Sequence, residues 1–194
     1  MKFTSLLVVM LFSCLLFSCL KAFAGTLSGG VKAAGQSAVV LETVPAKAFP
    51  APTQTAAMNQ QGMKFVPALL VIQKGTTVVF SNDDNVPHNV FWPNISGNKA
   101  LSHTVGTFNK GKTLSFKYEN AGNVPLLCNV HPKMTGTIVV SPSPYFAETD
   151  ADGNYSIKDV PDGAYKATEW HNGKATTLTV TVKGDTKLDF AAAN

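Results

Sequence analysis

The chain has 194 residues, with 16 lysines, 12 acidic residues and no arginine, and its formal net charge is +4. Without arginine the chain lacks the side chain that binds phosphate in a bidentate way, and so small a charge provides no extended basic surface. Nucleic-acid binding is therefore not expected. A chain of this length forms either one large domain or two small ones.

The first 24 residues have the three parts of a secretory signal peptide. Lys2 precedes an apolar run over residues 6–20, and a small-x-small site ends at Ala24. The run is shorter than the about 20 apolar residues that cross a bilayer. We predict cleavage after Ala24 and export to the periplasm. A lipoprotein with Cys19 as the lipidated residue is the alternative.

Residues 45–61 are predicted to be a linker. Three prolines lie there among Ala, Thr, Gln and Asn, with almost no charge. The alternative is a functional loop in which the thioethers of Met58 and Met63 bind a soft metal ion. Two methionines beside a linker more often serve packing, so the linker is the preferred interpretation.

Short runs rich in Val, Thr, Phe and Tyr recur between Gly, Pro, Asn and Asp, which is typical of sandwich strands. Within residues 113–118, strict alternation places Leu114, Phe116 and Tyr118 on one face. The sequence has no long amphipathic helix pattern and no repeat of fixed period. We predict an all-β protein, with strands in this part of the chain at 69–72, 76–80, 112–118 and 137–140.

The charge differs between two parts of the chain. Residues 25–140 carry nine lysines and four acids, whereas residues 141–194 carry five lysines and eight acids. The sequence Ser-Pro-Ser-Pro at 141–144 marks the change. This division predicts two modules with different surfaces, which we place at 62–140 and 141–194.

A seven-residue loop before the strand at 137–140 carries Cys128, His131 and Met134. Soft sulfur ligands combined with imidazole suit copper, and a cysteine with two histidines and a weak axial methionine is the blue-copper arrangement. The second histidine must come from elsewhere. Among the other three, His88 stands out because it follows the predicted strand 76–80 and lies on a loop at the end of that strand.

The cysteine count supports a metal site. Cys14 and Cys19 leave with the signal peptide, so the exported chain keeps Cys128 alone. An odd cysteine in an exported protein pairs between chains, stays free or binds a ligand. Because a free thiol is oxidised in such a compartment whereas a metal-bound thiolate is protected, we expect Cys128 to bind metal.

Residues 62–140 resemble the cupredoxins, the plastocyanin- and amicyanin-like blue copper proteins, in the Cys128-x-x-His131-x-x-Met134 spacing and in His88. The resemblance implies a Greek-key β-sandwich with one mononuclear type 1 copper bound by His88, Cys128, His131 and Met134. It also implies that the backbone N–H of Asn89 donates to the Cys128 sulfur. Residues 124–127 depart from the pattern, because many cupredoxins have an aromatic residue there.

The resemblance further implies a role in single-electron transfer. The exposed loop histidine, His131 here, would be the port through which electrons pass, with an apolar ring around it. The expected partner is a redox protein such as a c-type cytochrome or a periplasmic dehydrogenase, and the expected state is a monomer without a transmembrane segment. The candidate ring residues are Val86, Pro87, Pro93, Val130 and Pro132.

The C-terminal part resembles a second family. The turns at Asp152-Gly153 and Asp162-Gly163, with alternating strands around them, are similar to carboxypeptidase regulatory-like domains, which are small transthyretin-like β-sandwiches. That family opens with a strand, a Gly-rich turn and another strand, which are missing before residue 145. Residues 25–44 have this pattern. The resemblance therefore predicts one discontinuous module, 25–44 with 141–194, into which the copper domain is inserted.

Two functions are open at this point. One is a soluble periplasmic electron carrier, and the other is a copper-binding, copper-delivery or surface-interaction protein without an electron-transfer role. An enzyme is not expected, because four histidines are too few for a multicopper oxidase and no nucleophilic triad is evident. His103 and His171 are expected to be solvated or structural.

Overall fold

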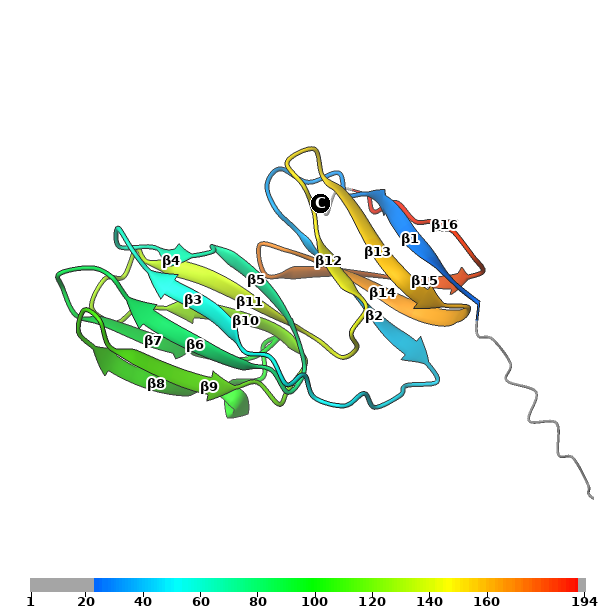
Figure 1. The fold of residues 1–194 in the computed structure, drawn as a ribbon. Coiled ribbons are helices and arrows are strands. Elements are labelled where there is room, and N and C mark those ends of the chain that lie inside the picture. The colour runs from blue at the N-terminus through cyan, green and yellow to red at the C-terminus, as the bar shows by residue number, and fades with distance from the viewer. Residues whose placement is uncertain (1–22, 192–194) are drawn as a thin grey trace, which may run out of the picture.

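The computed structural model describes residues 23–191, which form two β-sandwiches side by side (Figure 1). The predicted signal peptide, with Cys14 and Cys19, lies almost entirely outside the described residues. The all-β prediction is confirmed, because the helical structure among these residues is one 3-10 turn, η1 (Lys99–Leu101). None of the helices in residues 23–191 has the length and apolar character that crossing a membrane requires.

The first sandwich consists of a five-stranded and a four-stranded sheet. In the five-stranded sheet the strand order is β5-β11-β10-β7-β8, with β5 parallel to β11. In the four-stranded sheet the order is β4-β3-β6-β9, with β3 parallel to β6. The strands are β3 (Ala56–Gln60), β4 (Phe65–Val66), β5 (Leu69–Gln73), β6 (Thr77–Asn82), β7 (His88–Trp92), β8 (His103–Phe108), β9 (Thr113–Lys117), β10 (Gly122–Leu127) and β11 (Thr135–Ser141).

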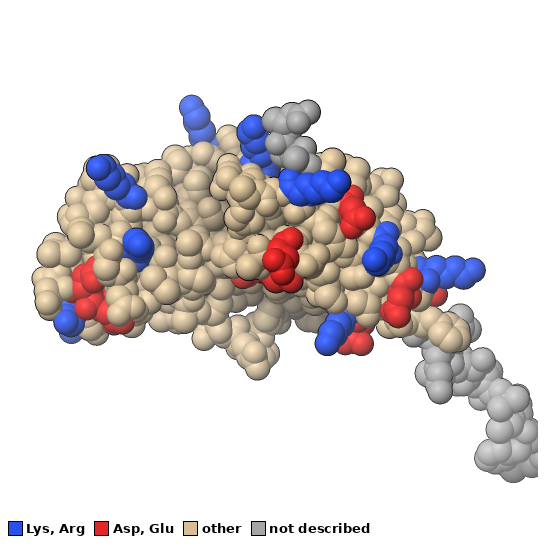
Figure 2. Space-filling view, turned by 90° about the horizontal axis from the view of Figure 1, so that it is seen from above, with Lys and Arg blue, Asp and Glu red and all other residues tan. Residues whose placement is uncertain are grey.

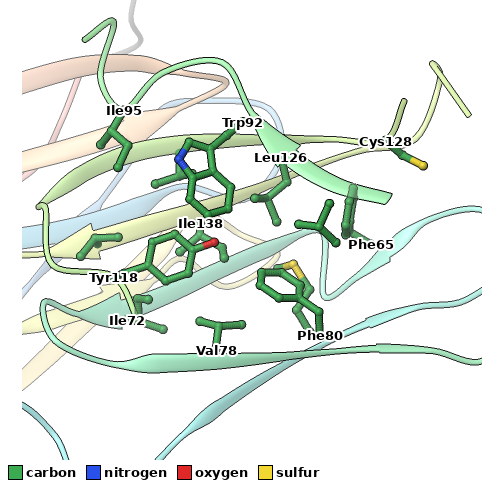
Figure 3. Close-up of a cluster of buried hydrophobic side chains, with 14 of the residues drawn as sticks. Phe65, Ile72, Val78, Phe80, Trp92, Ile95, Tyr118, Leu126, Cys128 and Ile138 are labelled. Atoms are coloured by element: carbon green, nitrogen blue, oxygen red, sulfur yellow. The ribbon is translucent and has the colours of Figure 1, made fainter. Parts of the chain in front are cut away.

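Alternating apolar residues from the two sheets form the core of this sandwich (Figure 3). The predicted face of β9 is confirmed, since Tyr118 is buried and Leu114 and Phe116 pack against the same cluster. The four strands predicted in this part are all present as β5, β6, β9 and β11, with ends that differ by at most two residues. Cys128 belongs to this cluster and lies at one end of it, beyond Leu126.

The predicted linker 45–61 is partly wrong. Its last residues form β3, which pairs with β6 and with β4. Met58 and Gln60 are fully buried there, and Met58 is thus a core residue and not an exposed metal ligand. The strand was missed because Ala, Met, Asn and Gln have weak β-propensity, so only the tertiary contacts of this segment mark it as a strand.

The second sandwich combines strands from both ends of the described chain. One sheet has the order β13-β1-β16 and the other has the order β12-β2-β14-β15. The N-terminal strands thus pair with C-terminal strands, β1 with β13 and β2 with β14. The strands are β1 (Ala24–Gly30), β2 (Ala38–Val44), β12 (Phe146–Glu148), β13 (Asn154–Pro161), β14 (Gly163–His171), β15 (Lys174–Val182) and β16 (Thr186–Lys187).

Side chains from the two ends of the chain also share one core. The cluster contains side chains from the N-terminal segment and from β13 and β14. At the turn before β13, a Cβ on Gly153 would lie 2.6 Å from the carbonyl oxygen of Val31, so only glycine fits there. The cluster members include Val31, Val39, Leu41, Tyr155, Ile157 and Tyr165.

The two sandwiches are joined by a third apolar cluster. The outward face of β2, with Ala38 and Val40, packs on Leu69, Val71 and Val139 of the five-stranded sheet. The N–H of Val71 also donates to the Glu148 carboxylate at 3.2 Å. The five-stranded sheet therefore has apolar contacts on both faces. The connections β6–β7 and β10–β11 lie at the end of the first sandwich away from the second module (Figure 1).

We propose that residues 25–44 and 141–194 form one discontinuous module, with the connection after residue 44 and the copper domain inserted between them. The chain passes between the two sandwiches twice, after residue 44 and before residue 145, and these two connections lie close together. The Phe49 and Tyr145 rings have centroids 5.8 Å apart, and Ser143 Oγ donates to the Leu41 carbonyl at 2.6 Å.

Replacing Leu41 with alanine tests whether β2 contributes to the core of the second module. Leu41 is fully buried, so we expect Leu41→Ala to lower the free energy of unfolding by about 2–5 kcal/mol, measured by urea denaturation. The control is Val44→Ala on the same strand, where the side chain is 46% exposed. Equal effects of the two substitutions would contradict the proposed module.

Candidate metal centre

The predicted ligands meet at one end of the first sandwich. His88 is the first residue of β7, and Cys128 follows the last residue of β10. These two strands are antiparallel neighbours, with Leu127 opposite Phe91, so the start of one lies beside the end of the other. The loop after Cys128 turns back at once, with the N–H of Met134 donating to the His131 carbonyl at 2.9 Å.

Three of the four predicted ligands form a compact group. The nearest donor atoms of His88, Cys128 and His131 all lie within 4.8 Å of one another. The Nδ1 atoms of the two histidines are 3.0 Å apart. His88 is fully buried, Cys128 and Met134 are nearly so, and His131 is half-buried. The histidine rings therefore direct the same atom, Nδ1, to one point beside the thiol.

The Cys128 thiol is held from the side of β7. It is unpaired, and its sulfur accepts a hydrogen bond of 3.3 Å from the backbone N–H of Asn89. This contact was implied by the cupredoxin resemblance and is present. Asn89 is itself fixed, because its carbonyl accepts from the side chain of the buried Gln60 at 3.2 Å. These contacts fix the position of the sulfur.

The other nitrogen of His88 contacts Asp84, which the sequence did not single out. The distance from His88 Nε2 to Asp84 Oδ2 is 2.8 Å. The N–H of Met63, the His88 imidazole and the N–H of Gly62 lower the pKa of Asp84 to about 2. A carboxylate accepting from Nε2–H leaves the lone pair of Nδ1 free, so this contact prepares His88 to bind a metal through Nδ1.

An apolar cleft of about 460 Å³ lies on the outer side of the predicted ligands. His131 and Met134 line it, together with the exposed Met63 and Val130. Val86 is also 40% exposed. Pro93, a candidate for the apolar ring, is not there: it follows the other end of β7 and lines a separate cleft with Trp92 and His103.

The remaining histidines lie elsewhere. His103 is exposed, and its ring stacks against Phe116 with centroids 4.4 Å apart. His171 lies in the second module, where Nδ1 is 3.0 Å from Ser37 Oγ and Nε2 is 2.8 Å from Asn172 Nδ2. Both agree with the structural or surface role expected from the sequence.

The donor set fits a copper ion. A metal with bonds of about 2.0–2.3 Å holds its donors within roughly 3–4.5 Å of one another, which is close to the spacing already present. One thiol and two imidazoles, with a buried thioether on the same loop, match the ligand preferences of copper and not those of a hard cation such as Mg²⁺.

Comparison with known proteins agrees with this chemistry. Residues 52–141 match the family model of copper-binding proteins of the plastocyanin/azurin family. Amicyanin of Paracoccus versutus is 29% identical over 97 residues, which cover 50% of this chain and 72% of that protein. Amicyanin-alpha of Methylorubrum extorquens is 30% identical over 120 residues, or 61% of this chain and 96% of that protein.

Plastocyanin of Scenedesmus fuscus is also similar, with 32% identity over 83 residues that cover 39% of this chain and 85% of that protein. These relatives are matched over most of their lengths, and the matched family range contains the whole His88, Cys128 and His131 group. The chain therefore belongs to the plastocyanin/azurin family of copper-binding proteins, the blue copper electron-transfer proteins.

Proposed function

We propose that this protein is an exported type 1 copper protein that carries single electrons between periplasmic redox partners, such as a c-type cytochrome or a dehydrogenase. The proposed ligands are His88, Cys128 and His131, with Met134 as the weak axial ligand. Copper supplies the one-electron redox centre when it is bound. The observation that carries the proposal is the buried cluster of three donor atoms within 4.8 Å.

The chain supports this role by holding its donors in place. His88 lies at the start of β7, and the Cys128 sulfur accepts a hydrogen bond from that strand. A site held by packed strands changes little when its charge changes by one, which favours fast electron transfer. The backbone at the start of β11 also packs closely against Phe65, because a Cβ on Gly136 would lie 2.8 Å from Phe65 Cβ.

Metal binding also requires the right protonation states. Nδ1 of His88 and Nδ1 of His131 are 3.0 Å apart and would both bind the metal through their lone pairs. Each neutral ring would then carry its proton on Nε2, and the Cys128 thiol would release its proton to become a thiolate. Asp84 lies 2.8 Å from Nε2 of His88, where its carboxylate can accept a hydrogen bond from that ring N–H.

The apolar cleft is the proposed docking face. His131 is half-buried at this surface, and Val130 and Pro132 flank it along the chain. Such a face loses its water at little cost, while the small interface typical of redox partners allows rapid release. Lysines and acids are interspersed on the side of the molecule seen in Figure 2, without one large patch of single sign.

Absorption and voltammetry separate the carrier from the delivery alternative. An intense blue band with reversible one-electron reduction is expected for a carrier. Colourless, tightly held Cu(I) without reversible oxidation would instead support copper delivery and would contradict the proposal.

Replacing Cys128 with serine should abolish the blue band. The band arises from charge transfer between the thiolate and copper, and a hydroxyl group cannot supply it. The measurement is the visible spectrum of the Cu(II)-loaded variant, with folding checked by circular dichroism. A folded Cys128→Ser variant that remained blue would exclude Cys128 as the ligand.

Replacing Met134 with leucine should keep the blue band and raise the reduction potential. Leucine has a similar volume, and loss of a weak axial donor disfavours Cu(II) relative to Cu(I). Voltammetry of the folded protein measures this change. A potential that fell, or did not change, would argue against Met134 as the axial ligand.

Replacing Val86 with lysine should slow electron self-exchange between two copies about tenfold, because about 1.4 kcal/mol of repulsion between like charges has this effect. The spectrum should stay nearly unchanged. Val44→Lys is the control, since Val44 has a similar exposure of 46% but lies in the second module. If both variants exchange at the same rate at low salt, the docking face lies elsewhere.

A further inference from the structure

The carboxylate of Asp84 connects two parts of the copper end that are distant in sequence. Its Oδ1 accepts from the N–H of Gly62 at 2.8 Å. Its Oδ2 accepts from the N–H of Met63 at 2.9 Å and lies 2.8 Å from Nε2 of His88. One charged group thus takes three hydrogen bonds, two from an exposed turn and one from a proposed copper ligand.

The backbone of Asp84 is anchored independently of these contacts. Its N–H donates to Asn82 Oδ1 at 2.9 Å. Asn82 is fully buried, and its Nδ2 donates to the carbonyls of Val86 and Phe108 at 2.9 and 3.0 Å. Since both the base of the loop and the carboxylate are fixed, a small change at the carboxylate is transmitted to its partners and not absorbed by the loop.

The turn bound by Asp84 is strained. Gln61 and Lys64 exchange backbone hydrogen bonds of 3.0 and 3.3 Å across it. The two residues between them have positive φ, +62° for Gly62 and +57° for Met63. Two-residue hairpin turns of the primed type need this conformation, but for methionine it costs about 1–2 kcal/mol. The hydrogen bonds to Asp84 offset that cost.

The same turn forms part of the apolar cleft. The Met63 side chain is 58% exposed and lines the cleft with His131, Pro132 and Met134. The backbone N–H of Met63 therefore donates to Asp84, while the Met63 side chain lies on the surface where a redox partner is proposed to bind. A partner that contacts Met63 would therefore touch the same turn that donates to the carboxylate.

We propose that Asp84 is a positioning residue that couples the turn at residues 61–64 to His88, so that the conformation of the docking face sets the reduction potential of the site. This inference rests on the proposed function. Asp84 holds the His88 proton at Nε2, orients Nδ1 and places a negative charge beside the ring. That charge stabilises the oxidised site, and displacement of the turn weakens its hold on His88.

The first test compares Asp84→Asn with Asp83→Asn. Both remove one negative charge from adjacent positions, but Asp83 contacts Asn59 and not His88. Asp84→Asn should keep the blue band, raise the reduction potential and lower Cu(II) affinity about 10-fold or more relative to Asp83→Asn. In the Cu(I) protein, the Nε2–H proton resonance of His88 should move upfield because its hydrogen bond is weaker.

The second test changes the turn without touching the site. Gly62→Ala places a methyl group where no atom lies within 4 Å, yet it disfavours the φ of +62°. It should shift the His88 resonance and the potential in the same direction as Asp84→Asn, by a smaller amount. Gly97→Ala is the control, with φ +83°, equally open space and no contact with the copper end.

The outcomes distinguish a failure of the proposed function from a failure of the role proposed for Asp84 and the turn. A wild-type protein without a blue band would overturn the proposed function. If the wild type is blue but Asp84→Asn behaves like Asp83→Asn, the positioning role of Asp84 is wrong. If Gly62→Ala matches Gly97→Ala in both resonance and potential, the coupling to the turn is wrong, even where Asp84 itself matters.

Discussion

The antiparallel pairing of β7 with β10 is the constraint on which the rest of the copper end depends. It brings the start of one strand beside the end of the other, so a histidine and a cysteine 40 positions apart in the numbering, His88 and Cys128, meet without a long loop. The hydrogen bond from Asn89 to the sulfur is a direct consequence, because Asn89 and Cys128 lie just beyond the paired residues Phe91 and Leu127. The sheet therefore gathers the donor atoms at one end of the sandwich.

The five-stranded sheet that contains these strands has apolar contacts on both faces. Its inner face belongs to the core of the copper domain, and β2 of the second module packs through Val40 on the outer face of β5 and β11. A sheet packed on both sides bends little, which keeps the strand ends in register. The second module packs on this sheet at the end away from the β6–β7 and β10–β11 connections, as Figure 1 shows, and none of the residues that line the apolar cleft belongs to that module.

What could be predicted from the sequence depended on how local the signal was. Cys128, His131 and Met134 were recognised because they lie on one short loop, and the association of the two ends of the chain was expected from a family pattern that both ends carry. Strand β3 was missed because its composition is atypical for a strand. Pro93 was misplaced because sequence proximity to His88 does not reveal that the intervening strand carries it to the opposite end.

Asp84 could not have been identified in this way. Beside Asp83 in a polar segment, it has the pattern of an ordinary solvated loop, and the amide groups that it binds lie 21 and 22 positions earlier in the chain. Only the pairing of β3 with β6 brings the turn after β3 next to the loop after β6. The strand missed within the predicted linker thus leads directly into the turn that supplies the partners of Asp84, and both omissions have one cause. Residues whose role lies in fixing a ligand, and not in binding the metal, become visible when the strands that carry their partners are placed.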